Sequence, residues 1–168
     1  YPLLSWETEA NFEGEGTEEN PYLLNDANDL VKLSTLTNTT ATAADYADKV
    51  YKLTADIDMT GISYKPVSWA TSMYTVQGAA FTGTLDGNNH IIKNISFTNL
   101  ATYGSTYGII GFISANGVVK NLHVQAFADG NIDFGAIAYE NNGAISNCRV
   151  SGSILGRRKV GGIVGWNY

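Results

Sequence analysis

The chain repeats one short pattern in Ile92-Lys93-Asn94-Ile95-Ser96-Phe97, in Val119-Lys120-Asn121-Leu122-His123-Val124 and in Ile145-Ser146-Asn147-Cys148-Arg149-Val150. In each segment Asn stands third, between an apolar first residue and two later apolar positions. The three segments start 27 and 26 residues apart. A repeat of this length is typical of proteins that stack one structural unit on the next, so it outranks other signals for the fold.

A second set of segments keeps the same offsets of 27 and 26 residues: Tyr107-Gly108-Ile109-Ile110, Phe134-Gly135-Ala136-Ile137 and Val160-Gly161-Gly162-Ile163. Extended residues rise about 3.3 Å each, so about 26 residues suffice for a three-sided coil of short strands and turns. Stacked coils pair through parallel strands. The two sets together predict an all-β fold, a parallel β-helix or solenoid.

Stacking would place equivalent apolar side chains in ladders inside the coils, where a single coil could not bury them alone. The predicted ladders are Ile92/Val119/Ile145, Ile95/Leu122/Cys148, Phe97/Val124/Val150 and Ile110/Ile137/Ile163. The alternation of inward-facing and outward-facing residues is interrupted at Asn94, Asn121 and Asn147, which predicts that the chain turns a corner at each of them. Stacked Asn side chains at a corner can hydrogen-bond to one another and to the backbone, at about 1 kcal/mol net for each bond.

The N-terminal part of the chain differs from the repeats. Residues 1–24 are turn-rich and acidic and are expected to be irregular. A helix is predicted over about residues 26–37, with Asn25 or Asp26 as its cap and one apolar stripe: Ala27, Leu30, Val31, Leu33 and Leu36. Because a stack of coils exposes backbone groups at its ends, we expect this helix to cap the N-terminal end.

The coils are expected to occupy residues 50–168. Apolar and polar residues alternate from Tyr51 to Met59, which predicts a half-buried strand, with Asp56 at a corner and Ile57 and Met59 in apolar columns. This organisation gives about four coils plus the start of another, in one domain over residues 1–168. The last unit stops partway, with no predicted cap at that end, so we expect the chain to be part of a longer protein.

Composition excludes several classes of function. The net charge is −6 and the only dense basic run is Arg157-Arg158-Lys159, which argues against nucleic acid as a partner. The single cysteine, Cys148, cannot form an internal disulfide, and no Cys/His cluster has the spacing of a metal site. No apolar run approaches the roughly 18 residues that span a bilayer. We therefore expect no cofactor and no membrane insertion of this segment.

The sequence resembles the bacterial cell-surface repeat proteins that carry the GLUG motif, named for its Gly-Leu-any-Gly-like core. Four stretches spread along most of the chain carry the resemblance: residues 14–24 with the following helix, Tyr51-Lys52-Leu53-Thr54-Ala55-Asp56-Ile57-Asp58-Met59, residues 81–92, and Val160-Gly161-Gly162-Ile163-Val164-Gly165. The chain departs from the pattern at Asn89, where Gly is usual, and at Ala138 and Tyr139 in the middle repeat. These departures affect turn and packing details.

This resemblance implies a right-handed β-helix of the pectin-lyase-like kind, of about four coils with an N-terminal capping α-helix. It also implies secretion and a passive or adhesive role at the cell surface, including regions beside surface peptidases. It implies no catalytic residues, because the motif residues of these proteins are structural.

One column of outward-facing residues is the best candidate for enzymatic chemistry. Asp58 is predicted to head a column with Ser96, His123 and Arg149, which would place His123 next to Arg149. A polysaccharide lyase needs a base and a group that neutralises charge, and this column could supply both. Asp56 and Asp58 could likewise act as paired carboxylates or bind calcium. Solvated residues on neighbouring coils explain the same pattern without any function.

Other candidate ligand-binding residues lie in loops. Arg157, Arg158 and Lys159 are predicted to stack beneath residues 129–133, giving either ion pairs between coils, worth about 0 to 1 kcal/mol each, or a site for acidic glycans. Four aromatic residues in or beside inserted loops could stack on sugars or simply cover the flank of the coils: Trp69, Tyr74, Tyr103 and Tyr107. The Asp86–His90 stretch is interpreted as a tight turn, and Cys148 as a buried small hydrophobe.

Two functions remain at this stage. The first is a non-catalytic extracellular module, a structural stalk or a region for adhesion or glycan binding, whose partners would be host or environmental polysaccharide or a surface protein. The second is a carbohydrate-active β-helix enzyme, a lyase or hydrolase. The acidic and basic candidates are scattered rather than gathered in one groove, which favours the first.

Overall fold

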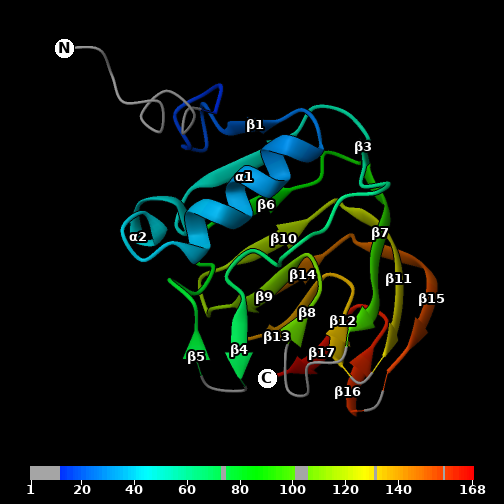
Figure 1. Cartoon of the computed structure of the whole chain (residues 1–168). Helices are drawn as coiled ribbons and strands as arrows, with labels where there is room; N and C mark the ends of the chain where they lie inside the picture. The colour runs from blue at the N-terminus through cyan, green and yellow to red at the C-terminus, as the bar shows by residue number, and fades with distance from the viewer. Residues whose placement is uncertain (1–11, 73–74, 101–105, 131, 157) are drawn as a thin grey trace.

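The computed structural model describes residues 12–72, 75–100, 106–130, 132–156 and 158–168 (Figure 1). Most strands in these ranges belong to four parallel sheets. Sheet 1 contains, in spatial order, β1 (Tyr22–Leu24), β2 (Val50–Leu53), β6 (Thr84–Asp86), β10 (Val118–Lys120) and β14 (Ala144–Ser146). Sheet 2 contains β3 (Ile57–Asp58), β7 (Ile91–Leu100), β11 (His123–Gly130) and β15 (Arg149–Leu155).

The two smaller parallel sheets have three strands each. Sheet 3 contains β8 (Thr106–Tyr107), β12 (Asp133–Gly135) and β16 (Arg158–Gly161). Sheet 4 contains β9 (Ile110–Ile113), β13 (Ala138–Asn141) and β17 (Val164–Asn167). The remaining strands, β4 (Ala70–Ser72) and β5 (Thr75–Val76), form an antiparallel pair.

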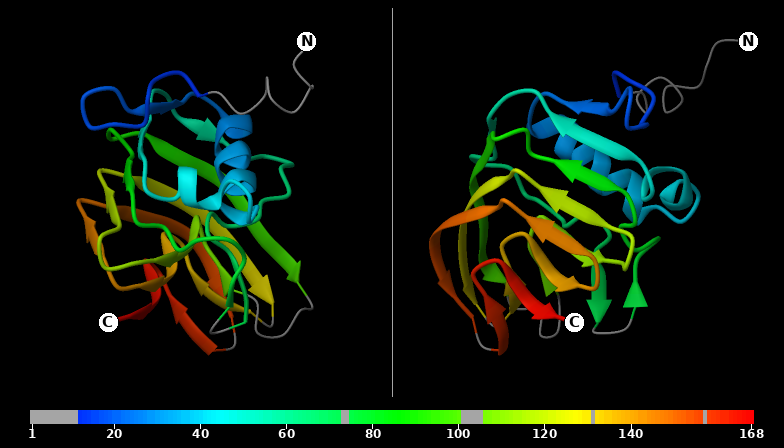
Figure 2. Two further views of the ribbon diagram at one scale, coloured as in Figure 1. Left: turned by 90° about the vertical axis from the view of Figure 1, so that its left-hand side faces the viewer. Right: turned by 180° about the vertical axis from the view of Figure 1, so that it is seen from behind.

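The chain passes through the sheets in the same order each time. The passages β6 to β9, β10 to β13 and β14 to β17 each add one strand to all four sheets, whereas β2 and β3 extend only sheets 1 and 2 and β1 extends only sheet 1. Strands β10 to β13 are followed in this way by β14 to β17. In Figure 2 the strands of sheet 1 lie one above another in chain order, from β1 at one end to β14 at the other. The fold is therefore all-β and like a parallel β-helix. We call each passage a coil.

Apolar ladders line the interior of the coils. Ile57, Ile92, Val124 and Val150 occupy equivalent places in sheet 2, and the first three are fully buried. Sheet 1 has the matching ladder Tyr51, Leu85, Val119 and Ile145. At about 25 cal/mol for each Å² removed from water, a fully buried Ile or Leu side chain contributes about 1.5 to 3 kcal/mol. Burial of these ladders therefore holds neighbouring coils together.

The predicted alignment of the later repeats is confirmed. Val119 pairs with Ile145 and Val124 with Val150, as the 26-residue offset requires. In the second set of segments, Phe134 pairs with both Tyr107 and Val160. The predicted ladder of Ile110 with Ile137 is wrong by one residue, because Ile110 pairs with Ala138.

The predicted alignment of the Ile92 segment is wrong. Val119 pairs with Leu85, and Ile92 pairs with Val124 rather than with Val119. Asn94 lies inside the long strand β7, with a φ of 58°, where the pairing with β11 shifts by one residue. Its neighbours resemble those of Asn121, but Asn94 marks a β-bulge and not a corner. The corner of this coil is formed by Asn88 and Asn89, whose φ values are 51° and 66°.

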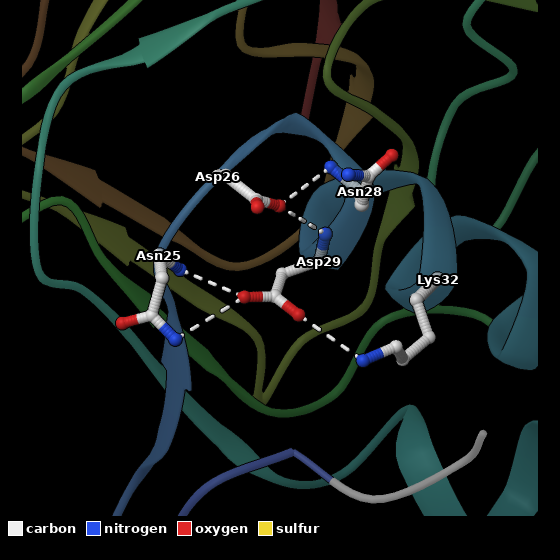
Figure 3. A network of polar contacts seen from close by, with 5 residues as sticks. All are labelled: Asn25, Asp26, Asn28, Asp29 and Lys32. Atoms are coloured by element: carbon white, nitrogen blue, oxygen red, sulfur yellow. Dashed lines mark hydrogen bonds and ion pairs between the residues drawn. The ribbon is translucent and has the colours of Figure 1, made fainter.

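The predicted helix exists as α1 (Ala27–Asn38), followed by a short second helix, α2 (Ala43–Tyr46). Asp26 is the cap, and its Oδ1 accepts hydrogen bonds from the backbone N–H groups of Asn28 and Asp29 at 2.8 and 3.1 Å (Figure 3). The Asp29 carboxylate in turn accepts from Asn25 and pairs with Lys32 at 3.1 Å. The sequence placed this helix to within one residue.

Helix α1 packs on the core through Leu30 and Leu33, which are fully buried. It lies close to β1 and β2, at the end of the molecule where the described chain begins (Figure 1). Residues 1–24 were expected to be irregular, and this is wrong for Tyr22–Leu24, which form β1 against the edge of β2. An open parallel edge offers unpaired backbone groups, so a short extended segment pairs with it.

The coil of β14 to β17 lies at the opposite end, and its interior positions are only partly covered. Ile163 is 42% exposed and Val160 is 39% exposed, whereas Ile137 and Phe134, their equivalents one coil earlier, are fully buried. Among the described residues no helix has the length and apolar character needed to cross a membrane.

Candidate functional site

A hollow with converging polar groups runs along the bend where the chain passes from sheet 1 to sheet 2. We call it the corner groove. Its volume is about 420 Å³ and its walls come from several coils: Asp56, Asn89, Ile91, Asn121, Leu122, His123, Asn147 and Arg149. It follows the long axis of the coil stack, because each bend contributes one set of side chains to it.

Asparagine makes the bend possible. Asn121 and Asn147 have φ values of 54° and 50°, a left-handed conformation that Asn tolerates better than other residues with a Cβ. Their side chains form a ladder, in which Asn147 Nδ2 donates to Asn121 Oδ1 at 2.7 Å and Asn121 Nδ2 donates to Asp86 Oδ1 at 3.0 Å. The predicted Asn corners at 121 and 147, and their stacking, are confirmed.

Three side chains from two adjacent strands form a polar cluster beside this ladder. His123 on β11 is directly opposite Arg149 on β15, as predicted. Arg149 Nη2 lies 3.2 Å from His123 Nδ1, and His123 Nε2 lies 2.9 Å from Ser151 Oγ. Since a guanidinium group can only donate, Nδ1 must accept and the neutral ring must carry its proton on Nε2. His123 therefore donates to Ser151.

Burial lowers the pKa of His123 below its usual value, and the positive charge of Arg149 lowers it further. Both effects favour the neutral imidazole, which is the form that accepts a hydrogen bond from Arg149. The side chains of this cluster therefore keep one arrangement at neutral pH.

Asp56 lies at the other end of the corner groove. Its Oδ1 accepts from the backbone N–H of Ile91 at 3.2 Å and from His90 Nδ1 at 3.0 Å. The Ile91 hydrogen bond, followed by the His90 one, lowers the pKa of Asp56, so it stays ionised at neutral pH. Asp56 was predicted at a corner, and it does lie in the bend between β2 and β3.

The structure separates Asp58 from the predicted column with His123 and Arg149, so that part of the prediction is wrong. Asp58 pairs with Lys93, whereas His123 pairs with Ile91 on the same strand β7. The Asp58 carboxylate instead accepts from Thr60 Oγ1 at 2.6 Å and from Asn94 Nδ2 at 3.0 Å, and these bonds lower its pKa. Ser96, the remaining residue of the predicted column, pairs with Phe127. The column fails because the whole Ile92 segment was misaligned with the later repeats.

The basic run is only partly described. Arg158 pairs in register with Asp133, one coil earlier, which agrees with the predicted stacking of these segments. Lys159 places its Nζ 3.1 Å from the ring centre of Trp166. Arg157 lies outside the described residues, and the ion pairs expected between these loops stay a prediction.

The aromatic candidates do not form a common platform. Tyr107 is only 9% exposed and its ring packs on Phe97, 5.5 Å between ring centres, so the prediction that it could stack on a sugar is wrong. Trp69 is half-buried, with Lys65 Nζ 4.5 Å from its ring centre. Tyr74 and Tyr103 lie outside the described residues.

Two interpretations of local chemistry agree with the structure. The Asp86–His90 stretch is a tight turn, in which Asn88 N donates to Asp86 Oδ1 at 2.8 Å and His90 N donates to Gly87 O at 2.8 Å. Cys148 packs half-buried against the apolar core, and burial raises the pKa of its thiol. An un-ionised thiol is a weak nucleophile, so Cys148 serves packing.

The described ranges contain no group of three or more His, Cys, Asp and Glu side chains that could hold a metal ion. Sequence reasoning missed Asn89 as a groove residue and Ser151 as the partner of His123. Ser151 is two residues after Arg149 on the same strand face, so strand periodicity could have found it. Asn89 was hidden by the misaligned Ile92 segment.

Comparisons with known proteins bear on the fold more than on the site. No sequence profile of a known protein family matches the chain. Halomucin from Haloquadratum walsbyi is 31% identical over 176 residues, which cover 96% of this chain but 2% of halomucin. A crystal structure of a candidate immunoglobulin A1 protease from Bacteroides ovatus has a TM-score of 0.64 at 23% identity, covering 92% of this chain and 44% of that chain. This likeness shows a shared fold.

Proposed function

We propose that this chain is a non-catalytic extracellular module of a larger surface protein, serving as a rigid stalk or as an adhesive, glycan-binding region. The observation that carries the proposal is the similarity of nearly the whole chain to a segment that makes up 2% of halomucin. A domain that recurs as so small a part of a very long chain is better suited to a repeated structural or binding role than to being that chain's single active centre. Secretion to the cell surface belongs to the same proposal.

The proposed architecture is a right-handed β-helix of about four coils whose N-terminal end is capped by α1, as in proteins with the GLUG motif. The buried side chains of Leu30 and Leu33 support the cap, because they cover apolar core next to β1 and β2. We further propose that residues 1–168 are one domain within a longer protein. Its partners would be polysaccharide or another surface protein, with neither nucleic acid nor direct membrane insertion involved.

One contact favours a second candidate, a carbohydrate-active enzyme. His123 Nε2 lies 2.9 Å from Ser151 Oγ, a distance at which a histidine base can activate a serine nucleophile. However, a general base must accept the serine proton, and Arg149 leaves His123 with its proton already on Nε2. No described carboxylate contacts Nδ1 to reverse this tautomer. The cluster therefore supports the non-catalytic proposal.

A turnover assay tests the proposal. The chain is incubated with a panel of neutral and acidic polysaccharides, while ultraviolet absorbance reports unsaturated lyase products and reducing ends report hydrolysis. We expect no turnover above a heat-denatured control, with binding to one or more glycans on an array. Robust turnover that His123→Ala abolishes, in a variant with an unchanged melting temperature, would contradict a non-catalytic module.

A further inference from the structure

Arg149 differs from the other cations around the corner groove because no described acidic group pairs with it. On the same sheet Lys93 pairs with Asp58, with 3.7 Å between Nζ and Oδ2. On sheet 1 Lys120 pairs with Asp86 at 3.8 Å. Among the described residues the guanidinium of Arg149 contacts the neutral ring of His123, which leaves most of its donors available.

His123 holds Arg149 in place without neutralising it. One guanidinium nitrogen donates to Nδ1 at 3.2 Å, and Ser151 anchors the opposite side of the ring at 2.9 Å. A guanidinium fork that is already oriented loses less side-chain entropy when it binds an anion, and its planar donors match the oxygens of a carboxylate or sulfate group. The cluster is therefore preorganised for an anionic group.

The rest of the groove offers hydroxyl-binding groups in a regular row. Asn147 is an exposed residue that uses one amide hydrogen for Asn121, and no described residue donates a hydrogen bond to its side-chain oxygen. Equivalent residues of adjacent coils are separated by the strand spacing of about 4.8 Å. That spacing is comparable to the length of one sugar ring in an extended polysaccharide. Ile91, which is half-buried, adds apolar surface between the polar groups.

We propose that the corner groove binds a linear glycan that carries carboxylate or sulfate groups, with an anionic group on Arg149 and sugar hydroxyls on Asn147 and its neighbours. This inference rests on the proposed function and names the ligand class of the same site. The carboxylate of Asp56 at the opposite end of the groove orients the ligand, since it repels anionic groups and accepts hydrogen bonds from hydroxyls. The charged groups of the ligand therefore lie toward β15.

Calorimetric titration of the whole chain tests the inference with four polymers: polygalacturonate, dextran sulfate, neutral dextran and poly-glutamate. We expect one or both anionic glycans to bind at least tenfold more tightly than dextran, and more tightly than poly-glutamate. Arg149→Gln should weaken that binding about tenfold, because a charge-assisted hydrogen bond is lost. Arg149→Lys keeps the charge but not the guanidinium fork, so its affinity should lie between those of the original chain and of Arg149→Gln. Carboxylated and sulfated ligands are distinguished by which polymer binds.

Lys93→Gln is the matched control, because it removes one positive charge from the same sheet outside the groove. It should change the affinity less than twofold at constant ionic strength. Equal losses in Lys93→Gln and Arg149→Gln would overturn the inference, as would equal binding of poly-glutamate or no binding of any glycan. None of these results contradicts a non-catalytic module, which fails only if turnover is detected in the same mixtures. The absence of any glycan binding would remove its adhesive role and leave that of a stalk.

Discussion

At the residue scale, the corners of the coils depend on asparagine. Asn121 combines a left-handed backbone with two side-chain hydrogen bonds, one to Asp86 and one from Asn147. Few side chains satisfy both demands, because the positive φ disfavours β-branched and bulky residues and the bonds require an amide. The same residue therefore shapes the bend and lines the corner groove.

Replacing Asn121 separates these two contributions. Asn121→Ala is expected to lower the free energy of unfolding by about 2 to 3 kcal/mol, since strain of about 1 to 2 kcal/mol adds to the lost hydrogen bonds. Asn121→Gly removes the bonds but permits the positive φ, so it should cost about 1 kcal/mol less. Urea denaturation measures both. Equal losses in the two variants would show that backbone strain contributes nothing here.

His123 gives a prediction about pH. Its pKa in the folded state is lowered, so the unfolded chain binds more protons in the range just below pH 6.5. The stability that His123 contributes is therefore fully present above pH 6.5 and is lost as the pH falls toward the folded pKa. Titration followed by NMR should place the His123 midpoint below 6.5, and Arg149→Gln should raise it. A midpoint unaffected by Arg149→Gln would contradict the contact between the two side chains.

At the element scale, neighbouring strands approach closely enough to require glycine at particular positions. Gly152 on β15 is paired with Ala126 on β11 and has a φ of 121°. A Cβ at this position would lie against the carbonyl oxygen of Ala126. A side chain would therefore force the two strands apart or change the backbone of β15.

A pair of glycine substitutions in one coil tests this packing. Gly152→Ala is expected to lower the free energy of unfolding by about 2 kcal/mol or more, from backbone strain and the clash with Ala126. Gly162→Ala is the control, because a Cβ there meets no atom within 4 Å. It should be neutral or slightly stabilising, through the lower entropy of the unfolded chain. Similar denaturation midpoints for the two variants would rule out the close approach of β11 and β15.

At the scale of the whole molecule, stability should grow with the number of coils. The last two coils are related by an offset of 26 residues in three sheets, as in the pairs Val118–Ala144, His123–Arg149 and Ala138–Val164. Each coil contacts mainly its neighbours, so every added coil contributes one more buried interface. The partly exposed Ile163 and Val160 show how much apolar surface the final coil leaves uncovered.

Duplicating one coil tests this additivity. A chain in which residues 117–142 are repeated once, directly after residue 142, should unfold at a higher temperature and with a larger denaturant m-value than the original. An insertion with the same residues in scrambled order serves as the control and should not raise the melting temperature. If the duplicated chain melts at or below the original temperature, the coils do not stabilise one another as a continuous stack.

The sequence by itself determined the parts of this protein that depend on local pattern. The 26-residue offset identified parallel stacking and the ladders of the last two coils, Asp26 was one of two predicted caps of α1, and Asn121 and Asn147 marked true corners. These features follow from periodicity, side-chain chemistry and backbone preference, all of which depend on residues that are close together in the sequence.

Only the tertiary structure decided which segment stands beside which where loops differ in length. In the structure Ile92 lies opposite Val124, Asn94 forms a bulge, and Asp58 is not aligned with His123. The tertiary structure also buried Tyr107 and brought Asn89 and Asp56 into the corner groove with Arg149. The physical reason is that register is set by the combined packing of whole coils, where one bulge or one longer turn outweighs a local resemblance between two six-residue segments.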